Sequence, residues 1–288
     1  MNIKQIENIL LVGGIEPNEA KIEAKMLVKH FAGLSDIDLM LKDEFEMNTK
    51  LLEAAQLRAA KRVPIQHIIG TAYFMGEDFI VNETVLIPRD ETELLVRKTV
   101  EIIERKRTNL PSLHPSNTLV LDIGTGSGCI ACMVAKLSSV QVIGLDISTD
   151  ALRVALENAT KLNLNNKAIF RKSDVFSNVR EGEKFDVIVS NPPYIPPSEK
   201  AAIQKEVSFD PKLALYTTDE EGIEFYKKIT EGAPKVLNNG GYLIFELGIG
   251  QAQKVHELMD LNGFVDIEIQ KDLAGIERVI SGRLAVVD

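Results

Sequence analysis

The tetrapeptide Asn-Pro-Pro-Tyr at residues 191–194 combines residue types that can hold a planar amino group. It follows an apolar run that is typical of a buried strand of a parallel sheet. Pro192 and Pro193 have no backbone donor and a fixed φ, so the loop presents carbonyl oxygens. Asn191 adds a side-chain acceptor, and Tyr194 adds an aromatic face. The loop therefore suits the NH2 group of an amide or a nucleobase, although a Pro-rich turn without a chemical role has the same composition.

A second motif, Asp-Ile-Gly-Thr-Gly-Ser-Gly at residues 122–128, lies between an expected strand and an expected helix. Domains of α/β type bind nucleotide-like ligands at such loops, because glycines admit a close backbone approach and the helix start offers free amides. The motif departs from the dinucleotide fingerprint G-x-G-x-x-G, since Cys129 stands three residues after Gly126. Neither Lys nor Arg occurs in residues 122–135. The loop therefore favours a ligand that has no phosphate to neutralise.

Two aspartates follow the next two expected strands. Asp146 stands about 20 residues after the glycines, where a carboxylate can accept hydrogen bonds from both hydroxyls of a ribose. Asp174, with Val175 and Phe176 beside it, could accept a hydrogen bond from an adenine amino group. Each aspartate alone could equally be a strand-end or helix-capping residue. Together with the glycine loop, the two aspartates predict an adenosine-containing ligand.

The elements that must position these residues alternate between strand and helix beyond residue 117. We expect strands near residues 119–121, 140–145, 168–170, 185–190 and 242–245, and helices from residue 129, at 151–162 and at 221–236. This order predicts an α/β fold with a mostly parallel sheet. The stretch at residues 195–218 is long for a connection, which is typical of a binding loop or lid.

The first third of the chain has a different pattern. Residues 1–70 show helical periodicity, and the segment that follows reads as two short strands around a Gly-containing turn. We therefore expect three parts: an N-terminal helical bundle at 1–70, a β-hairpin linker at 71–90 and an α/β domain at 91–288.

Composition excludes some classes of protein. The chain has 288 residues and a formal net charge of −9, which disfavours a protein that grips nucleic acid through its phosphates. No apolar run approaches the roughly 18 residues that span a bilayer, and the N-terminus does not read as a signal peptide. We expect a cytoplasmic protein without membrane contact.

The two cysteines, Cys129 and Cys132, have the C-x-x-C spacing of a redox or metal pair. Apolar residues surround both of them, and the four histidines are scattered along the chain. The pattern therefore favours a buried helix, and it predicts no metal site.

Residues 122–128, Asp146, Asp174 and residues 191–194, in this order, resemble the class I S-adenosylmethionine-dependent methyltransferases that modify amino groups. Further segments are similar to the release-factor glutamine methyltransferases, the HemK family; they lie at residues 64–70, 86–93, 210–215 and 272–278. The resemblance implies a Rossmann-like, mostly parallel seven-stranded sheet. The sequence departs from the family pattern at His67, Asp90 and Asp210.

The resemblance also implies an activity and a partner. These enzymes methylate the side-chain nitrogen N5 of the glutamine in the Gly-Gly-Gln motif of class I peptide chain release factors, and they leave S-adenosylhomocysteine as product. The family uses its N-terminal helical domain, here residues 1–70, to engage the release factor.

The resemblance gives each motif residue a role. The backbone of the glycine loop packs against the methionine part of the cofactor, through Gly124, Thr125, Gly126, Ser127 and Gly128. Asp146 holds the ribose, and Asp174 with Val175 borders the adenine. Asn191 and the carbonyl of Pro192 receive the glutamine NH2, with Asn191 also next to the cofactor. Pro193 and the ring of Tyr194 complete the substrate loop.

Two other functions fit parts of the pattern. A nucleic-acid methyltransferase acting on adenine N6 or guanine N2 could place a flipped base in the same loop. A non-enzymatic assembly subunit could have kept a cofactor-binding fold. The net charge of −9 and the lack of a basic, aromatic-rich insert favour a protein substrate, without direct contact to nucleic acid. We expect a monomer.

Overall fold

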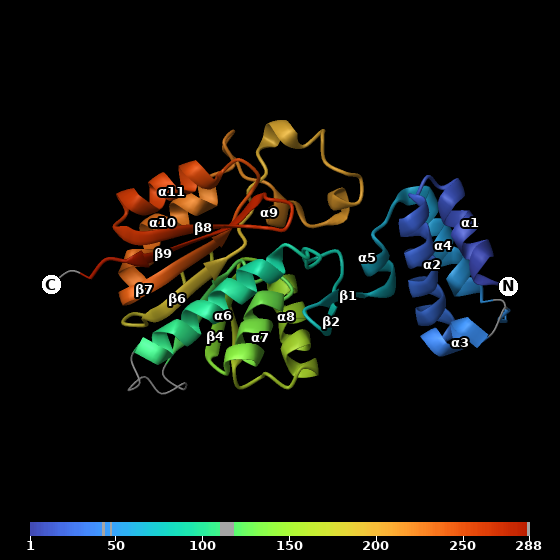
Figure 1. Cartoon of the computed structure of the whole chain (residues 1–288), viewed down its shortest axis with the longest axis horizontal. Helices are drawn as coiled ribbons and strands as arrows, with labels where there is room; N and C mark the ends of the chain where they lie inside the picture. The colour runs from blue at the N-terminus through green and yellow to red at the C-terminus, as the bar shows by residue number, and fades with distance from the viewer. Residues whose placement is uncertain (42–43, 47, 110–117, 287–288) are drawn as a thin grey trace. The chain divides into compact units, whose positions relative to one another are not determined.

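The computed structural model describes residues 1–41, 44–46, 48–109 and 118–286 of the chain (Figure 1). It forms two compact units. The first holds Met1–Thr71 and Gln204–Phe209, and the second holds Ala72–Ile203 and Asp210–Asp288. Within the described residues, none of the helices combines the length and the apolar character that crossing a membrane requires.

The first unit is a helical bundle. Its helices are α1 (Ile3–Val12), α2 (Pro17–Ala32), α3 (Asp36–Leu41), α4 (Thr49–Lys61) and α5 (Ile65–Ile69). Local signals set their ends, since Asn2 and Gln5 form a capping box at α1 and Pro17 is the first residue of α2. Gly33 ends α2 with a φ of 66°, a conformation that favours glycine. The apolar stripes of these helices meet in one core.

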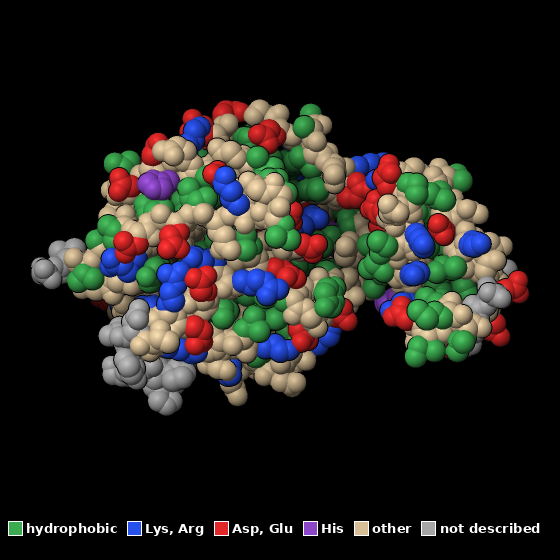
Figure 2. Space-filling view, in the orientation of Figure 1, with side chains coloured by type: hydrophobic (Ala, Val, Ile, Leu, Met, Phe, Trp, Pro, Cys, Tyr) green, Lys and Arg blue, Asp and Glu red, His purple; other side chains and the backbone are tan. Residues whose placement is uncertain are grey.

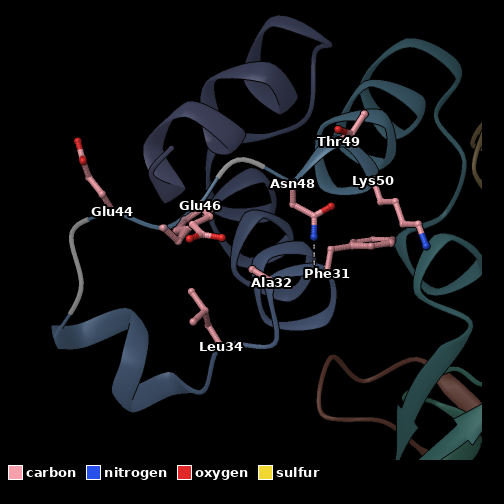
Figure 3. A pocket seen from close by; sticks show the side chains of 9 residues that line it. Phe31, Ala32, Leu34, Glu44, Glu46, Asn48, Thr49 and Lys50 are labelled. Atoms are coloured by element: carbon pink, nitrogen blue, oxygen red, sulfur yellow. Dashed lines mark hydrogen bonds between the residues drawn. The ribbon is translucent and has the colours of Figure 1, made fainter.

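Asn48 ties the start of α4 to the end of α2. Its Oδ1 accepts a hydrogen bond from the backbone N of Leu51 at 3.2 Å and so caps α4. Its Nδ2 donates to the carbonyl of Phe31 at 2.6 Å, beside a surface hollow that Leu34 and Lys50 also line (Figure 3). One polar side chain thus satisfies groups at two helix ends.

A buried arginine joins α4, α2 and the segment Gln204–Phe209 of the same unit. Arg58 is only 1% exposed. Its guanidinium lies 2.8 Å from the carboxylates of Glu23, Glu19 and Glu206. Burial raises the pKa of Glu23, although Arg58 opposes that rise. Glu206 thereby fixes part of the 195–218 stretch to the helical bundle.

Helix α3 exposes apolar side chains, namely Ile37, Met40 and Leu41. Figure 2 shows hydrophobic side chains gathered on the surface over this helix. A group of exposed apolar side chains on one short helix is typical of a surface that contacts another molecule.

The strands β1 (Thr71–Phe74) and β2 (Glu77–Ile80) form the predicted hairpin. Met75 and Gly76 connect them, and both have a positive φ, as the tight turn of a two-residue hairpin requires. Phe74 and Phe79 meet edge to face with their ring centroids 5.9 Å apart. Both rings belong to a core of the second unit.

The second unit is built on a seven-stranded sheet. Its strands are β3 (Leu119–Ile123), β4 (Gln141–Asp146), β5 (Ala168–Lys172), β6 (Phe185–Ser190), β7 (Leu237–Glu246), β8 (Phe264–Lys271) and β9 (Glu277–Leu284). They lie in the order β5-β4-β3-β6-β7-β9-β8. The first five are parallel, whereas β9 runs antiparallel to both β7 and β8. The predicted Rossmann-like, mostly parallel sheet is confirmed.

Helices cover both faces of this sheet (Figure 1). One core lies under α6 (Thr92–Asn109), α7 (Cys129–Ser138) and α8 (Thr149–Lys161), and the other lies under α10 (Glu224–Val236) and α11 (Ala252–Leu261). The structure confirms the interpretation of the cysteine pair, because Cys129 and Cys132 are unpaired thiols buried in α7. Burial raises the pKa of Cys129 to about 12, which keeps that thiol protonated and unreactive.

Two parts of this unit go beyond the sequence analysis. No element was predicted after residue 245, where the structure has α11, β8 and β9. The stretch at residues 195–218 is not wholly irregular, since it contains the short helices η2 (Pro197–Glu199), η3 (Val207–Phe209) and α9 (Lys212–Leu215). Ile195 also forms a parallel bridge with Tyr216, which closes the stretch into a loop at its base.

Candidate active site

A cavity of about 300 Å³ lies at the carboxyl ends of β3, β4 and β6. The chain runs from β3 to one side of the sheet through β4 and β5, and later to the other side through β6. Open α/β sheets bind ligands at such a switch point, because the connecting loops diverge there. The size of the cavity is at the lower end of the range for small-molecule sites.

The glycine loop forms the floor of this cavity and is fixed to β4. The backbone N atoms of Gly124 and Thr125 both donate to the carbonyl of Leu145, at 2.8 and 2.9 Å. Gly128 has a φ of 77°, and a Cβ there would lie 3.0 Å from Cβ of Ala155. The lack of side chains therefore lets the loop, α7 and α8 approach one another closely.

Asp146 connects the end of β4 to the glycine loop. Its Oδ2 accepts from the backbone N of Gly126 and its Oδ1 from that of Ser148, both at 2.9 Å. Burial raises the pKa of Asp146, and these backbone donors oppose the rise. Each carboxylate oxygen can still accept a second hydrogen bond. The side chain can therefore receive two neighbouring hydroxyls, as the sequence predicted for a ribose.

A second carboxyl group lies beneath the loop. Asp122 is fully buried and accepts from Oγ1 of Thr125 at 2.6 Å. Burial raises its pKa to about 7, and the neighbouring Asp146 adds to the rise. Its Oδ1 has no hydrogen-bond partner in the described part of the chain. Two carboxyl groups so close together favour a ligand with positive charge.

The segment after β5 reaches the cavity with an unusual backbone. Val175 has a φ of 48°, which is a true outlier for a β-branched residue. The hydroxyl of Ser173 donates to the carbonyl of Val175 at 2.9 Å and helps to hold this conformation. Asp174 is exposed, and its backbone N donates to Oγ of Ser177 at 2.9 Å. Such strain is typical of segments held for a functional purpose.

The tetrapeptide loop is anchored at both of its ends. Before it, the hydroxyl of Ser190 donates to the carbonyl of Ile123 at 2.7 Å, which joins β6 to β3. After it, the carbonyl of Tyr194 accepts from Nε2 of Gln251 at 3.0 Å. Nδ2 of Asn191 points to the hydroxyl of Thr92, 3.4 Å away. These bonds hold the loop in one conformation. None of them uses Oδ1 of Asn191.

The structure brings most of the predicted site residues around one cavity. Those that line it are Gly124, Gly126, Asp146, Asp174, Val175, Asn191, Pro192 and Pro193. Four others are not among its lining residues, namely Thr125, Ser127, Gly128 and Tyr194. Thr125 and Ser127 belong to the glycine loop, and both residues are buried. The ring of Tyr194 is partly buried, and burial raises its pKa to about 12, so the hydroxyl stays protonated.

Sequence reasoning missed part of the wall. Pro211, Leu213 and Ala214 of the 195–218 stretch line the cavity, as do Phe225 and Lys228 of α10. The ammonium of Lys228 lies 2.6 Å from Glu224, so its charge is already paired. The length of the 195–218 stretch and the family resemblance at residues 210–215 were the signals for the first part of this wall, and no signal indicated the two residues of α10.

Asp210, one of the departures from the family pattern, lies next to that wall. Its side chain is buried, and its Oδ2 accepts from Arg89 at 2.6 Å. Burial raises the pKa of Asp210 to about 6, although Arg89 opposes the rise. Where the family more often has glutamate, the shorter aspartate therefore still pairs with an arginine.

Two family models match this chain. "Methyltransferase domain" matches residues 114–276, and "PrmC N-terminal domain" matches residues 4–70. The first covers the sheet and the cavity described above.

Curated relatives match over most of their length. A release factor glutamine methyltransferase of Geobacter sulfurreducens is 38% identical over 94% of this chain and 91% of its own. One from Chlorobaculum tepidum is 38% identical over 92% of this chain and 90% of its own.

Solved structures share the fold at low identity. A methyltransferase from Pyrococcus furiosus has a TM-score of 0.50 and 18% identity, covering 82% of this chain and 97% of that one. The hMettl16 catalytic domain, solved in complex with MAT2A 3'UTR hairpin 6, has a TM-score of 0.58 and 15% identity, and 92% of each chain is covered. These likenesses concern the fold alone. Because the glycine loop and the Asn-Pro-Pro-Tyr loop meet in one cavity, and because relatives at 38% identity match over more than nine tenths of this chain, the chain belongs to the family of release factor glutamine methyltransferases.

Proposed function

We propose that this enzyme transfers a methyl group from S-adenosylmethionine to N5 of the glutamine in the Gly-Gly-Gln motif of class I peptide chain release factors. One observation carries the proposal: Gly126, Asp146 and Asn191 line the same cavity. The names of the curated relatives support release factor glutamine as the target. S-adenosylhomocysteine is then the second product.

The cavity has the properties that this cofactor needs. The bare glycine loop and Asp146 can hold an adenosine with its methionine part, and Asp174 with Val175 can border the adenine ring. S-adenosylmethionine supplies a methyl group on a positively charged sulfur. The carboxyl groups of Asp122 and Asp146 favour that positive charge.

The Asn191 loop can overcome the low reactivity of an amide nitrogen. The lone pair of that nitrogen is delocalised, so the nitrogen must lose planarity and gain positive charge as it attacks. Oδ1 of Asn191 and the carbonyl of Pro192 can each accept one hydrogen of the NH2 group, and this stabilises the developing charge. The stiff Pro-Pro backbone and the ring of Tyr194 restrict the direction of attack. After methyl transfer the nitrogen is acidic, so it releases its proton without a strong base.

The helical unit is proposed to engage the release factor. Its match to "PrmC N-terminal domain" and the exposed apolar side chains of α3 support that role. A nucleobase would fit the same loop, but the relatives are named for a protein substrate and the chain carries a net charge of −9. A monomeric state and a cytoplasmic location complete the proposal.

Mass spectrometry of a release factor tests the function. After incubation with this protein and S-adenosylmethionine, we expect one added methyl group on the Gly-Gly-Gln glutamine. A release factor whose glutamine is replaced should gain none. Methylation of DNA or ribosomal RNA, with no change in the release factor, would refute the proposal.

Asp146→Ala is expected to weaken binding of S-adenosylhomocysteine by about 100-fold or more. The substitution removes the acceptor for two hydroxyls and the bond that holds Gly126, and hydrogen bonds to a charged group contribute about 1.5–3 kcal/mol each. Isothermal titration calorimetry measures the change. Asp150→Ala is the control, because Asp150 is exposed and pairs with Arg153 on the same helix, α8. Equal affinities of the Asp146 variant and the wild type would contradict the assignment.

A further inference from the structure

Glu246 is a buried carboxyl group that the proposed mechanism does not use. It ends β7 and is only 4% exposed. Its Oε2 is buried and has no hydrogen-bond partner among the described residues. Burying such a group is costly unless it interacts with something that compensates.

The neighbours of this carboxyl group lead to the active site. The hydroxyl of Thr92, at the start of α6, and the side-chain amide of Asn191 both act on this carboxyl group and lower its pKa. Nδ2 of Asn191 in turn lies 3.4 Å from Oγ1 of Thr92. The three side chains therefore form one network, on which the tetrapeptide loop, α6 and β7 converge.

Neighbours of this kind can select which end of the Asn191 amide faces them. A carboxylate can only accept hydrogen bonds, so it selects the NH2 end of a neighbouring amide and repels the oxygen end. The hydroxyl of Thr92 can accept from Nδ2 while it donates to Glu246. With the NH2 end held on that side, Oδ1 is left for the cavity.

We propose that Glu246 and Thr92 are positioning residues: they hold Nδ2 of Asn191 and so present Oδ1 to the amide group that is methylated. The inference rests on the proposed function of Asn191. It adds an electrostatic effect, because a negative charge at the NH2 end polarises the amide and makes Oδ1 a stronger acceptor.

The charge of Glu246 should depend on pH near neutrality. Burial raises its pKa to about 7, Glu91 adds to the rise, and Arg278 opposes it. Among the described residues, Glu246 also acts electrostatically on Tyr194, Tyr226 and Cys129. The protonated form can donate, so it no longer selects the NH2 end of Asn191. The turnover number kcat should therefore fall as the pH decreases through about 7, which gives the pH profile of kcat an acid limb. The positive charge of bound S-adenosylmethionine would move this limb to lower pH.

Glu246→Gln tests the inference. The variant keeps the shape but loses the charge and gains a donor. We expect kcat for release factor methylation to fall about tenfold, with KM and the affinity for S-adenosylhomocysteine within about twofold of wild type. The acid limb of the kcat profile should disappear. An unchanged kcat and an unchanged limb would overturn the proposal, as would a change in KM alone.

Thr92 provides a second, matched set of variants. Thr92→Val should lower kcat severalfold, and Thr92→Ser should restore it. The control is Thr99→Val on the same helix, because Thr99 is equally buried but donates only to the carbonyl of Leu95. A similar loss in the Thr99 variant would point to packing and overturn the proposal. If the wild type does not methylate a release factor, the proposed function is wrong. If the wild type is active and the Glu246 and Thr92 variants are equally active, only the positioning role is wrong.

Discussion

Replacing Asn191 with alanine is expected to lower kcat for release factor methylation by about 10-fold to 1000-fold. The variant loses the Oδ1 acceptor that offsets the positive charge on the attacking nitrogen, and removing one preorganised polar group from such a site costs about this much. Binding of S-adenosylhomocysteine should change little, because the glycine loop and Asp146 are held by their own backbone bonds. Single-turnover kinetics and calorimetry measure the two quantities separately.

Two further variants at asparagine positions make this experiment specific. Asn191→Asp keeps an acceptor but places a carboxylate beside Glu246, so one of the two should stay protonated at neutral pH and activity should be intermediate. Asn166→Ala, at an exposed position between α8 and β5, should behave as wild type. Wild-type turnover in Asn191→Ala would show that the loop does not hold the target amide.

Arg58→Ala is expected to destabilise the helical unit by about 3–5 kcal/mol. Glu23 is buried beside Arg58, and removing one member of a buried pair leaves the other charge uncompensated. The more exposed Glu19 and Glu206 lose the same partner, although water can reach them. Native-state hydrogen exchange of the amides in α2 and α4 of the full chain measures the local free energy of unfolding.

A double variant separates lost charge pairing from lost volume. Arg58→Met with Glu23→Leu removes both buried charges and keeps apolar bulk, so at least half of the lost stability should return. Arg153→Ala is the surface control. Its side chain is 71% exposed, and its pair with Asp150 should contribute no more than about 0.5 kcal/mol. A loss below about 1 kcal/mol in Arg58→Ala would mean that the cluster is not a structural anchor.

The parallel half of the sheet was predictable because its signals are local. Its strands are mostly short apolar runs, and a helix follows β3, β4 and β6 before the next strand. Right-handed crossovers leave few ways to arrange such units. The last two strands were not predicted. β8 is a mostly exposed edge strand with charged residues such as Asp266 and Glu268. This segment forms a strand because it pairs with β9. That pairing is a long-range property with no local signature.

The rest of the cavity wall was not assigned from the sequence, although the family resemblance included residues 210–215. Pro211 and Leu213 lie in a stretch with no periodicity, and Phe225 and Lys228 lie on a helix whose sequence resembles that of any amphipathic surface helix. A strained Val175 cannot be inferred from residue type either, since valine is unfavourable at positive φ.

The sequence by itself determined which chemical groups stand at the ends of the parallel strands. Strands that run in parallel bring their carboxyl ends to one edge, so the order of the glycine loop, Asp146 and Asn191 was enough to predict a shared site. Only the tertiary structure decided how Asn191 is oriented. Its neighbours Thr92 and Glu246 come from a distant helix and a distant strand, and packing alone brings them together. A side-chain amide has two ends of nearly the same shape, so the direction in which it faces depends on partners that no local pattern encodes.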